Sequence, residues 1–528
     1  ARLVAEDLMT THLLVLDAGT GSGRAVVFDR AGNQVGVAQE EWRHLPEPGV
    51  PGSMAFDIAG GWALLRRCIQ GALASCGLTG RDIAAISATS MREAIVLYDG
   101  AGREIWACAN VDSRAGAEVA ELRARSAGFE RDFYDISGEA FALGALPRLN
   151  WVRRHAPEVF ERVRAISMVN DWIGKRLTGE ITVEPTNGST NGLLDLTTRQ
   201  WSEVLIAKAG LDRAIFPRIV EPGTVIGEVT AAAAADTGLR AGTPVVAGGG
   251  DVQLGAIGLG VVELGAAAVL GGTFWQQVVN IPQGKVDETM RLRVNAAALP
   301  GMNQAEALTF FVGLTARWFR DAFCQEEVRR AAETGRDAYA LMEELAMQVP
   351  AGSHGIIPVF SDAMDFGNWY HAAPSLLNLS IDPAVANKGS IFRAIQENAA
   401  IVAAVNLARV EAFAGVGGTG PLVLAGGAAK GVLWPQILAD VTGREIHIPV
   451  VREATALGGA AAAATGVGQF ATIAEAGRAF VRWDRTIRPD ATNRAVYDEA
   501  RGRWQAAYAA QKALVDAGLT TSMWRAPG

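Results

Sequence analysis

The sequence predicts an α/β fold of two domains, and three observations support this. The chain has 528 residues, which is more than one hydrophobic core usually serves. Short strand-like runs alternate with helical patterns, as in a mixed sheet with helices on its faces. A strand, a glycine-rich turn and a second strand occur near residue 20 and again near residue 272. This weak internal duplication places the boundary near residues 260–265 and predicts domains 1–262 and 263–528.

In the first half, strand-like runs occupy residues 12–17, 24–29 and 34–39, with turns that contain glycine between them. Apolar residues at helical spacing from Trp62 to Cys76 predict a helix after Asp57. Residues 83–87 and 94–99 return to strand patterns. Residues 242–260 are then predicted to form a strand, a glycine turn and a helix of small residues.

In the second half, residues 266–280 repeat the order strand, Gly-Gly-Thr turn, strand. A long helix is expected over 390–413, a strand over 421–426, and a helix with Trp434 and Val441 on its apolar face. Segment 456–474 is rich in Ala and Gly and predicts a close-packed core helix, because such small side chains drive membrane insertion poorly. The charged tail from about residue 484 to 528 is expected to be helical and to pack on the surface.

The composition excludes several classes of protein. Hydrophobic residues make up 49% and charged residues 20%, which is globular composition. The net charge of −8 without a basic block argues against nucleic-acid and anionic-membrane partners. The four cysteines lack CxxC spacing, which favours free thiols. Glu6 and Asp7 precede any apolar run, unlike a signal peptide, so we expect a cytoplasmic protein.

The turn over residues 19–23 is predicted to hold phosphate, because glycine lets successive backbone N–H groups approach one anion. An ordinary glycine hairpin is the alternative for one such turn, but a second turn opening the second half favours a nucleotide held between two lobes. A Walker A motif is excluded, since neither Gly174-Lys175 nor Gly284-Lys285 precedes serine or threonine. Arg24 stands where a dinucleotide fingerprint needs glycine.

Two aspartates follow strands beside glycine-rich turns. Asp17 would repel phosphate unless a cation lies between them, and Mg²⁺ prefers carboxylates, water and phosphate oxygens. Arg24 would balance the transferred charge. The alternative for Asp17 is a structural acceptor of N–H groups. Asp251 follows three glycines at a strand end, where it could accept the proton of an alcohol or cap the next helix, and the spacing leaves both open.

The stretches "LDAGTGSGRAVVFD", "GGGDVQLGAIG", "LGGTF", "FRAIQENAA" and "LVLAGGAAKGVLWPQILADV" together resemble the FGGY carbohydrate kinases, members of the actin-like ATPase superfamily. The resemblance runs from about His12 to the C-terminus. It implies two domains with duplicated ribonuclease H-like cores and an interdomain cleft that closes on ATP and substrate. It also implies that Asp251 is the base and that Asp17 and Asp251 surround Mg²⁺. The other implied nucleotide contacts are Thr20, Gly21, Ser22 and Arg24 to the γ-phosphate, Gly272 and Thr273 to the phosphates, and Gly426, Gly427 and Lys430 near adenosine.

Within the family, "SMREAIVLYD", "WACANVDSRA", "GGTFWQQVVN" and "FFVGLTARWFRDAFC" resemble members that act on the quorum-sensing signal autoinducer-2. This implies ATP-dependent phosphorylation of the terminal 5-hydroxyl of open-chain 4,5-dihydroxypentane-2,3-dione, and for close relatives regulation by the phosphocarrier protein HPr. Gly21 departs from the common GTTS pattern and lacks a hydroxyl. Arg148 replaces a usual lysine, and Leu143 stands where glycerol kinases have a substrate-contacting tyrosine, which disfavours glycerol.

An uncharged polyol-dione needs a few directed polar groups in an apolar surround. Arg92 and Glu93 match the Arg-Glu pair with which glycerol kinases hold substrate hydroxyls. Both can face the substrate only if the chain turns after the strand; a surface ion pair is the alternative. Asp112 is a further candidate, and Trp275 is either a substrate wall or hinge packing. Glycerol, xylulose and ribulose are alternative acceptors. A non-catalytic actin-like ATPase, which would lack a base such as Asp251, is the alternative of another class.

Overall fold

The computed structural model describes residues 11–360, 370–418, 420–450 and 453–523. Glu6 and Asp7, on which the expected cytoplasmic location rests, lie outside the described residues, as do residues 524–528 of the predicted tail. Among the residues that are described, no helix combines the length and hydrophobicity needed to cross a bilayer. The four cysteines are free, as expected.

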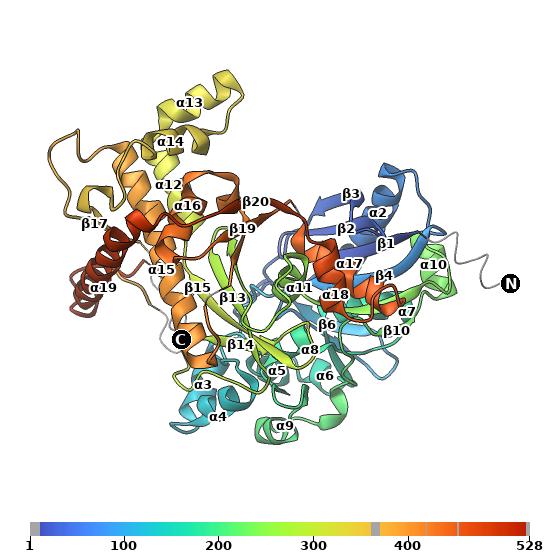
Figure 1. The fold of residues 1–528 in the computed structure, drawn as a ribbon. Helices are drawn as coiled ribbons and strands as arrows, with labels where there is room; N and C mark the ends of the chain where they lie inside the picture. Colours follow the sequence, from blue (N-terminus) through green and yellow to red (C-terminus); the bar gives the residue numbers. More distant parts are fainter. Residues whose placement is uncertain (1–10, 361–369, 419, 451–452, 524–528) are drawn as a thin grey trace.

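The first half builds a six-stranded sheet in the order β10-β11-β4-β1-β2-β3 (Figure 1). The three N-terminal strands form the predicted meander, β4 and β11 continue it in parallel to β1, and β10 is antiparallel to β11. The bounds are β1 (His12–Ala18), β2 (Ser22–Asp29), β3 (Gln34–Glu41), β4 (Ile83–Ser90), β10 (Val225–Glu228) and β11 (Pro244–Gly250).

The second half repeats this pattern, which confirms the internal duplication. Its sheet has the order β14-β15-β13-β12-β18-β19-β20. On one side of β12, the strands β13 and β15 follow in antiparallel pairing. On its other side, β18 and β19 are parallel to it and β20 is antiparallel to β19. The strands around β1 pair in the same way. The bounds are β12 (Ala267–Gly271), β13 (Trp275–Pro282), β14 (Arg293–Ala296), β15 (Met302–Thr309), β18 (Leu422–Gly426), β19 (Ile446–Pro449) and β20 (Trp483–Ile487).

The parallel strands bring the predicted site segments to one edge of each sheet. In the first sheet Asp17 lies opposite Thr89 and Gly250 lies opposite Ser90, so β1, β4 and β11 end together. In the second sheet Gly271 lies opposite Gly426. Ligands of open α/β sheets bind beyond the carboxyl ends of such strands.

Alternating side chains of the first sheet face two helical layers. Leu14 and Leu16 pack toward α2 (Ile58–Ser75), which begins after Asp57 as predicted, and toward α7 (Val169–Thr178). Leu13 and Val15 pack toward α11 (Asp251–Gly258), α17 (Ala454–Gly466) and α18 (Ile473–Phe480). Because α17 and α18 come from the second half but cover the first sheet, the packing does not follow the chain division predicted at residue 262.

Helices α11 and α17 cross at contact distance through glycine. A Cβ atom added to Gly258 would lie 1.9 Å from the carbonyl oxygen of Ala454. A Cβ added to Gly458 would lie 1.9 Å from the carbonyl oxygen of Leu254. The two glycines therefore let the backbones approach, which fixes the start of α11, and Asp251 with it, against α17.

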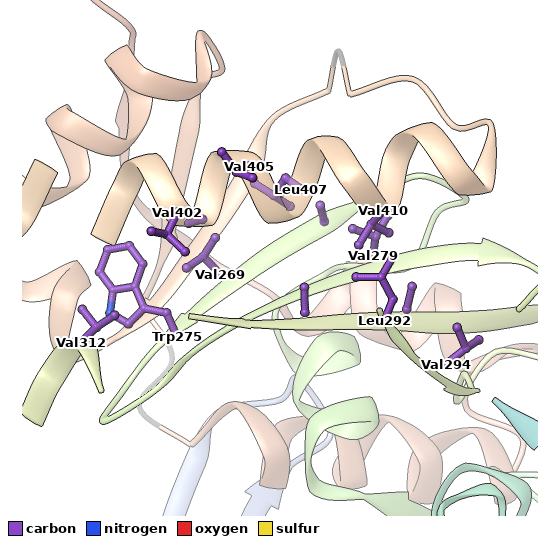
Figure 2. Close-up of a cluster of buried hydrophobic side chains, with 14 of the residues drawn as sticks. Val269, Trp275, Val279, Leu292, Val294, Val312, Val402, Val405, Leu407 and Val410 are labelled. Carbon is purple, nitrogen blue, oxygen red and sulfur yellow. The ribbon is translucent and has the colours of Figure 1, made fainter. Parts of the chain in front are cut away.

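The long helix α15 (Lys388–Ala414) lies across the second sheet, where Val402, Leu407 and Val410 face the strand residues Val269 and Val279 (Figure 2). Around it pack α12 (Val312–Phe323), α14 (Ala338–Ala346), α16 (Leu433–Thr442), α19 (Arg494–Asp516) and β16 (Ile357–Val359), which pairs with β17 (Ser375–Leu377); α13 (Gln325–Thr334) packs on α14. The tail differs from the prediction at its start, since β20 joins the sheet edge before α19 begins.

A third region, between β4 and β10, contributes to the site from the side. It contains a small sheet of β6-β5-β7 (Glu104–Cys108, Ile95–Tyr98, Ala165–Met168). Its helices are α3 (Gly116–Ala124), α4 (Phe129–Ser137), α5 (Ala145–His155), α6 (Pro157–Phe160), α8 (Pro185–Gly188) and α9 (Glu203–Ala209), and α10 (Ala231–Thr237) follows β10. The Ser189 hydroxyl accepts from the N–H of Ala296, so this region covers the edge strand β14.

Candidate active site

The first glycine turn exposes backbone N–H groups. Three carbonyl oxygens are engaged on one side: that of Gly19 accepts from the Trp42 indole at 3.0 Å, that of Gly21 from the Trp42 N–H at 3.2 Å, and that of Thr20 lies 2.7 Å from His44 Nε2. In a trans peptide the N–H points opposite the carbonyl. Within the described chain, the N–H groups of Thr20 and Gly21 have no protein acceptor, so both could donate to an anion.

Asp17 and Arg24 sit opposite each other at the mouth of this turn. They are register partners on β1 and β2, with Arg24 Nε 3.2 Å from Asp17 Oδ2. Arg24 also pairs with Glu453, which precedes α17. Burial raises the pKa of Asp17 to about 7 against the opposing charge of Arg24, and Asp251 and Glu453 add to the rise. Asp17 and Asp251 thus lie close enough to repel each other.

Asp251 is the first residue of α11 and not its cap; Gly250 holds the cap position, so the capping alternative is wrong. Among the described residues, the carboxylate accepts only the neighbouring Val252 N–H, at 2.8 Å, and 39% of its side chain is exposed. Arg92 Nε lies 3.7 Å from Asp251 Oδ1. Partial burial raises the pKa of Asp251 to about 6, with Arg92 opposing and Glu93 adding to the rise. The group is free to accept a proton at neutral pH.

Arg92 and Glu93 are buried, which excludes the surface ion-pair alternative. Glu93 has φ of 62°, so the chain turns after β4 as the prediction required. Arg92 donates to both oxygens of Glu306 on β15, at 2.6 and 3.1 Å. Glu93 pairs with Arg293 on β14 at 2.5 Å. Burial favours a raised pKa for Glu93, but Arg293 and Arg92 outweigh it and the pKa lies below its usual range.

Asp112 does not face open space as a substrate contact would. Its side chain is fully buried, pairs with Arg114 at 2.7 Å and accepts from the Met54 N–H at 2.6 Å. Its place is structural, because both partners hold the carboxylate inside the protein. Arg148 connects this segment to the site: it donates to the carbonyl oxygens of Glu93, Asn110 and Asp112.

The second glycine turn opens onto a cavity of about 520 Å³, a size that suits a small-molecule ligand. Gly272, Thr273, Gly427 and Lys430 line it, as the resemblance implied for the nucleotide, while Gly426 ends β18 beside Gly271. The other walls come from α12, α14, α15 and α16. The carbonyl of Thr273 accepts from the Gly313 N–H at 3.0 Å, so the turn packs on the start of α12.

Trp275 lines this cavity, and its prediction as a substrate contact needs correction. It is 1% exposed and lies 5.1 Å from the ring of Trp434, at the end of the apolar cluster with Val312 and Val402 (Figure 2). Its ring lines the cavity of Gly272 and Lys430.

Among the described residues, no group of three or more His, Cys, Asp or Glu side chains is arranged to hold a metal ion. Asp17 and Asp251 are near enough for their charges to interact, and two carboxylates are the kind of ligand that Mg²⁺ takes beside phosphate.

Family models give the identity of this architecture. The N-terminal domain of the FGGY family of carbohydrate kinases matches residues 12–258, and the C-terminal domain of the same family matches residues 282–467. The chain belongs to this family. FGGY proteins are phosphotransferases, and kinase activity implies ATP as the phosphoryl donor.

Curated relatives extend over the full length. The chain is 56% identical to the autoinducer-2 kinase of Enterobacter sp. (strain 638), with 98% of each chain covered. It is 54% identical to the autoinducer-2 kinase of Salmonella paratyphi A, with 100% of each covered.

Solved structures agree with the two-domain ribonuclease H-like fold. The xylulose kinase of Rhodospirillum rubrum superposes with a TM-score of 0.83 at 26% identity, covering 95% of this chain and 99% of that one. The glycerol kinase of Plasmodium falciparum with ADP has a TM-score of 0.81 at 19% identity, covering 94% of this chain and 98% of that one, which supports the fold alone.

Sequence reasoning missed four charged residues of the site: Glu139, Arg293, Glu306 and Glu453. None stands in a motif that signals chemistry. The alternating pattern of β15 could have placed Glu306 on one face of the sheet, but not opposite Arg92.

Proposed function

We propose that this FGGY kinase transfers the γ-phosphoryl group of ATP to the 5-hydroxyl of open-chain autoinducer-2. The observation that carries the proposal is the identity above one half, over the full length, with autoinducer-2 kinases. The geometry is compatible with it, because the partly exposed carboxylate of Asp251 lies beside the buried Arg92–Glu93 turn, which can offer polar groups to a hydroxylated acceptor.

In the proposed reaction, Arg92 and Glu93 orient the acceptor, and Asp251 accepts the proton of its hydroxyl. The hydroxyl oxygen forms a bond to the γ-phosphorus as the bond to the β–γ bridging oxygen breaks, and ADP leaves. The N–H groups of Thr20 and Gly21, with Ser22 and Arg24, hold the transferred phosphoryl group. Gly272 and Thr273 hold the other phosphates, and Gly426, Gly427 and Lys430 lie near adenosine. Mg²⁺, held by Asp17 and Asp251, would neutralise phosphate charge.

A panel of acceptors tests the substrate. The dihydroxy-dione, glycerol, xylulose and ribulose are each supplied with ATP, ADP release is followed, and the product is identified by mass spectrometry. We expect the dione to have a kcat/KM at least about tenfold above the others, a preference that one or two directed hydrogen bonds can supply. A higher kcat/KM for another acceptor would assign that substrate instead. ATP hydrolysis that no acceptor stimulates would favour the non-catalytic ATPase.

Replacing Asp17 by alanine is expected to weaken magnesium-dependent nucleotide binding by roughly one to two orders of magnitude, because it removes one of two carboxylates beside the phosphates. Calorimetric titration of ATP at several Mg²⁺ concentrations measures this. Asp236→Ala is the control, since Asp236 pairs with Arg66 away from the glycine turns. An unchanged Mg²⁺ requirement in Asp17→Ala would reject the role given to Asp17.

HPr is part of the proposal as a regulatory partner. Adding purified HPr to the acceptor assay is expected to change the rate of ADP release. Equal rates with and without HPr at saturating concentration would show that HPr does not regulate this kinase.

A further inference from the structure

Two charged residues of the second sheet face the substrate-binding turn. Arg293 on β14 and Glu306 on β15 are direct register partners in an antiparallel pair. Their side chains are 6% and 4% exposed. Opposite charges on facing positions of neighbouring strands attract each other, yet each of these residues forms its shortest contacts elsewhere.

Those contacts pair the strands reciprocally with consecutive residues of the turn after β4. Glu306 forms an ion pair with Arg92, and Arg293 forms one with Glu93. Each charged residue of the turn is thus paired with a strand residue of the opposite charge, so that the two ion pairs join the turn to both strands. Glu139 adds a second carboxylate: its Oε2 lies 2.7 Å from the same Nη2 of Arg293 and accepts from Arg293 Nε at 2.8 Å.

The arrangement determines what Arg92 offers to the active site. Both of its terminal nitrogens donate to Glu306, so only Nε is directed toward Asp251, at 3.7 Å. Without the Glu306 charge, Asp251 and Glu93 would be the carboxylates closest to Arg92. A buried guanidinium that has lost its partner moves to another, because leaving it unpaired is costly. Arg92 would then approach Asp251 from the present 3.7 Å to hydrogen-bond distance.

We infer that Glu306 and Arg293 are positioning residues for phosphoryl transfer, which keep Arg92 and Glu93 directed at the acceptor and keep the Arg92–Asp251 ion pair at 3.7 Å rather than at hydrogen-bond distance. This inference rests on the proposed roles of Arg92, Glu93 and Asp251. Neither positioning residue lines the nucleotide cavity, so their effect is confined to the acceptor side.

The test is Glu306→Gln, which keeps the shape of the side chain but removes its charge. We expect kcat/KM for the acceptor to fall at least about tenfold, with both kcat and KM affected, and the KM for ATP to stay within about twofold. The matched control is Glu411→Gln, which neutralises the carboxylate paired with Arg444, away from the site. Glu411→Gln should leave kcat, the KM for the acceptor and the KM for ATP unchanged.

A double-mutant cycle separates positioning from structural damage. If Glu306 acts through Arg92, Glu306→Gln has little further effect in an Arg92→Gln background, because the guanidinium that it restrains is gone. An equal loss in both backgrounds would overturn the inference, as would a shift in the KM for ATP as large as that for the acceptor.

Failure of the substrate proposal can be told apart from failure of this inference. The cycle is run with whichever acceptor the panel shows to be best, so a different sugar would replace the substrate and leave the test intact. Arg293→Gln provides the second variant should Glu306→Gln fold poorly, with Glu93→Gln as its partner in the cycle. An additive pair there would also contradict the inference.

Discussion

Replacement of Asp251 by asparagine is expected to lower kcat by a factor on the order of 10² to 10⁴, the range for loss of a general base. Asparagine keeps the shape of the side chain but cannot take the hydroxyl proton. Asp251 also stands beside the phosphates in this account, yet the cavity that would hold the nucleoside lies on the other lobe. The affinity for ATP is therefore expected to change much less than kcat.

Steady-state kinetics with the best acceptor, together with ATP titration, measure both quantities. Asp236→Asn is the control, because Asp236 on α10 accepts hydrogen bonds from Trp62 and Arg66 of α2, away from the glycine turns. Activity of Asp251→Asn within severalfold of the parent would show that Asp251 is not the base.

The second large effect concerns stability. Gly458→Ala is expected to lower the free energy of unfolding by roughly 3 kcal/mol, because overpacking at a site that cannot relax costs this much. The added Cβ would lie 1.9 Å from a backbone oxygen of α11, which is below any permitted contact, so the helices must separate. Urea-induced unfolding measures the change.

Gly502→Ala provides the matched control. Gly502 lies within α19, and a Cβ there meets nothing within 4 Å. Alanine at an open helical position is expected to stabilise the protein by about 0.5–1 kcal/mol. Equal effects of the two substitutions would show that the α11–α17 contact is not as close as described.

The local sequence pattern predicted the features of the fold that depend on residues close together in the chain. Short β-branched apolar runs predicted the strands that flank the first glycine turn, and helical spacing predicted α2 after Asp57. The two Gly-containing turns were found because glycine marks them in the sequence. The carboxyl edge of three parallel strands then brought Asp17, Arg92 and Asp251 together.

What the sequence could not predict depends on residues far apart in the chain. Arg24 meets Glu453 across 429 positions, and Arg92 meets Glu306 across 214. Asp112 was predicted from polarity alone, but its partner Arg114 holds it inside the protein. Trp275 follows a phosphate turn in sequence, yet its position in β13 directs it to the cavity shared with Trp434.

A crystal structure with a non-hydrolysable ATP analogue, Mg²⁺ and the acceptor tests most directly whether two glycine turns and Asp251 form one phosphoryl-transfer site. We expect the terminal phosphorus to lie between the turn at Thr20–Ser22 and the turn at Gly272–Thr273, and the acceptor hydroxyl to lie within hydrogen-bond reach of Asp251. A nucleotide whose terminal phosphate contacts neither turn, or an acceptor hydroxyl away from Asp251, would contradict it.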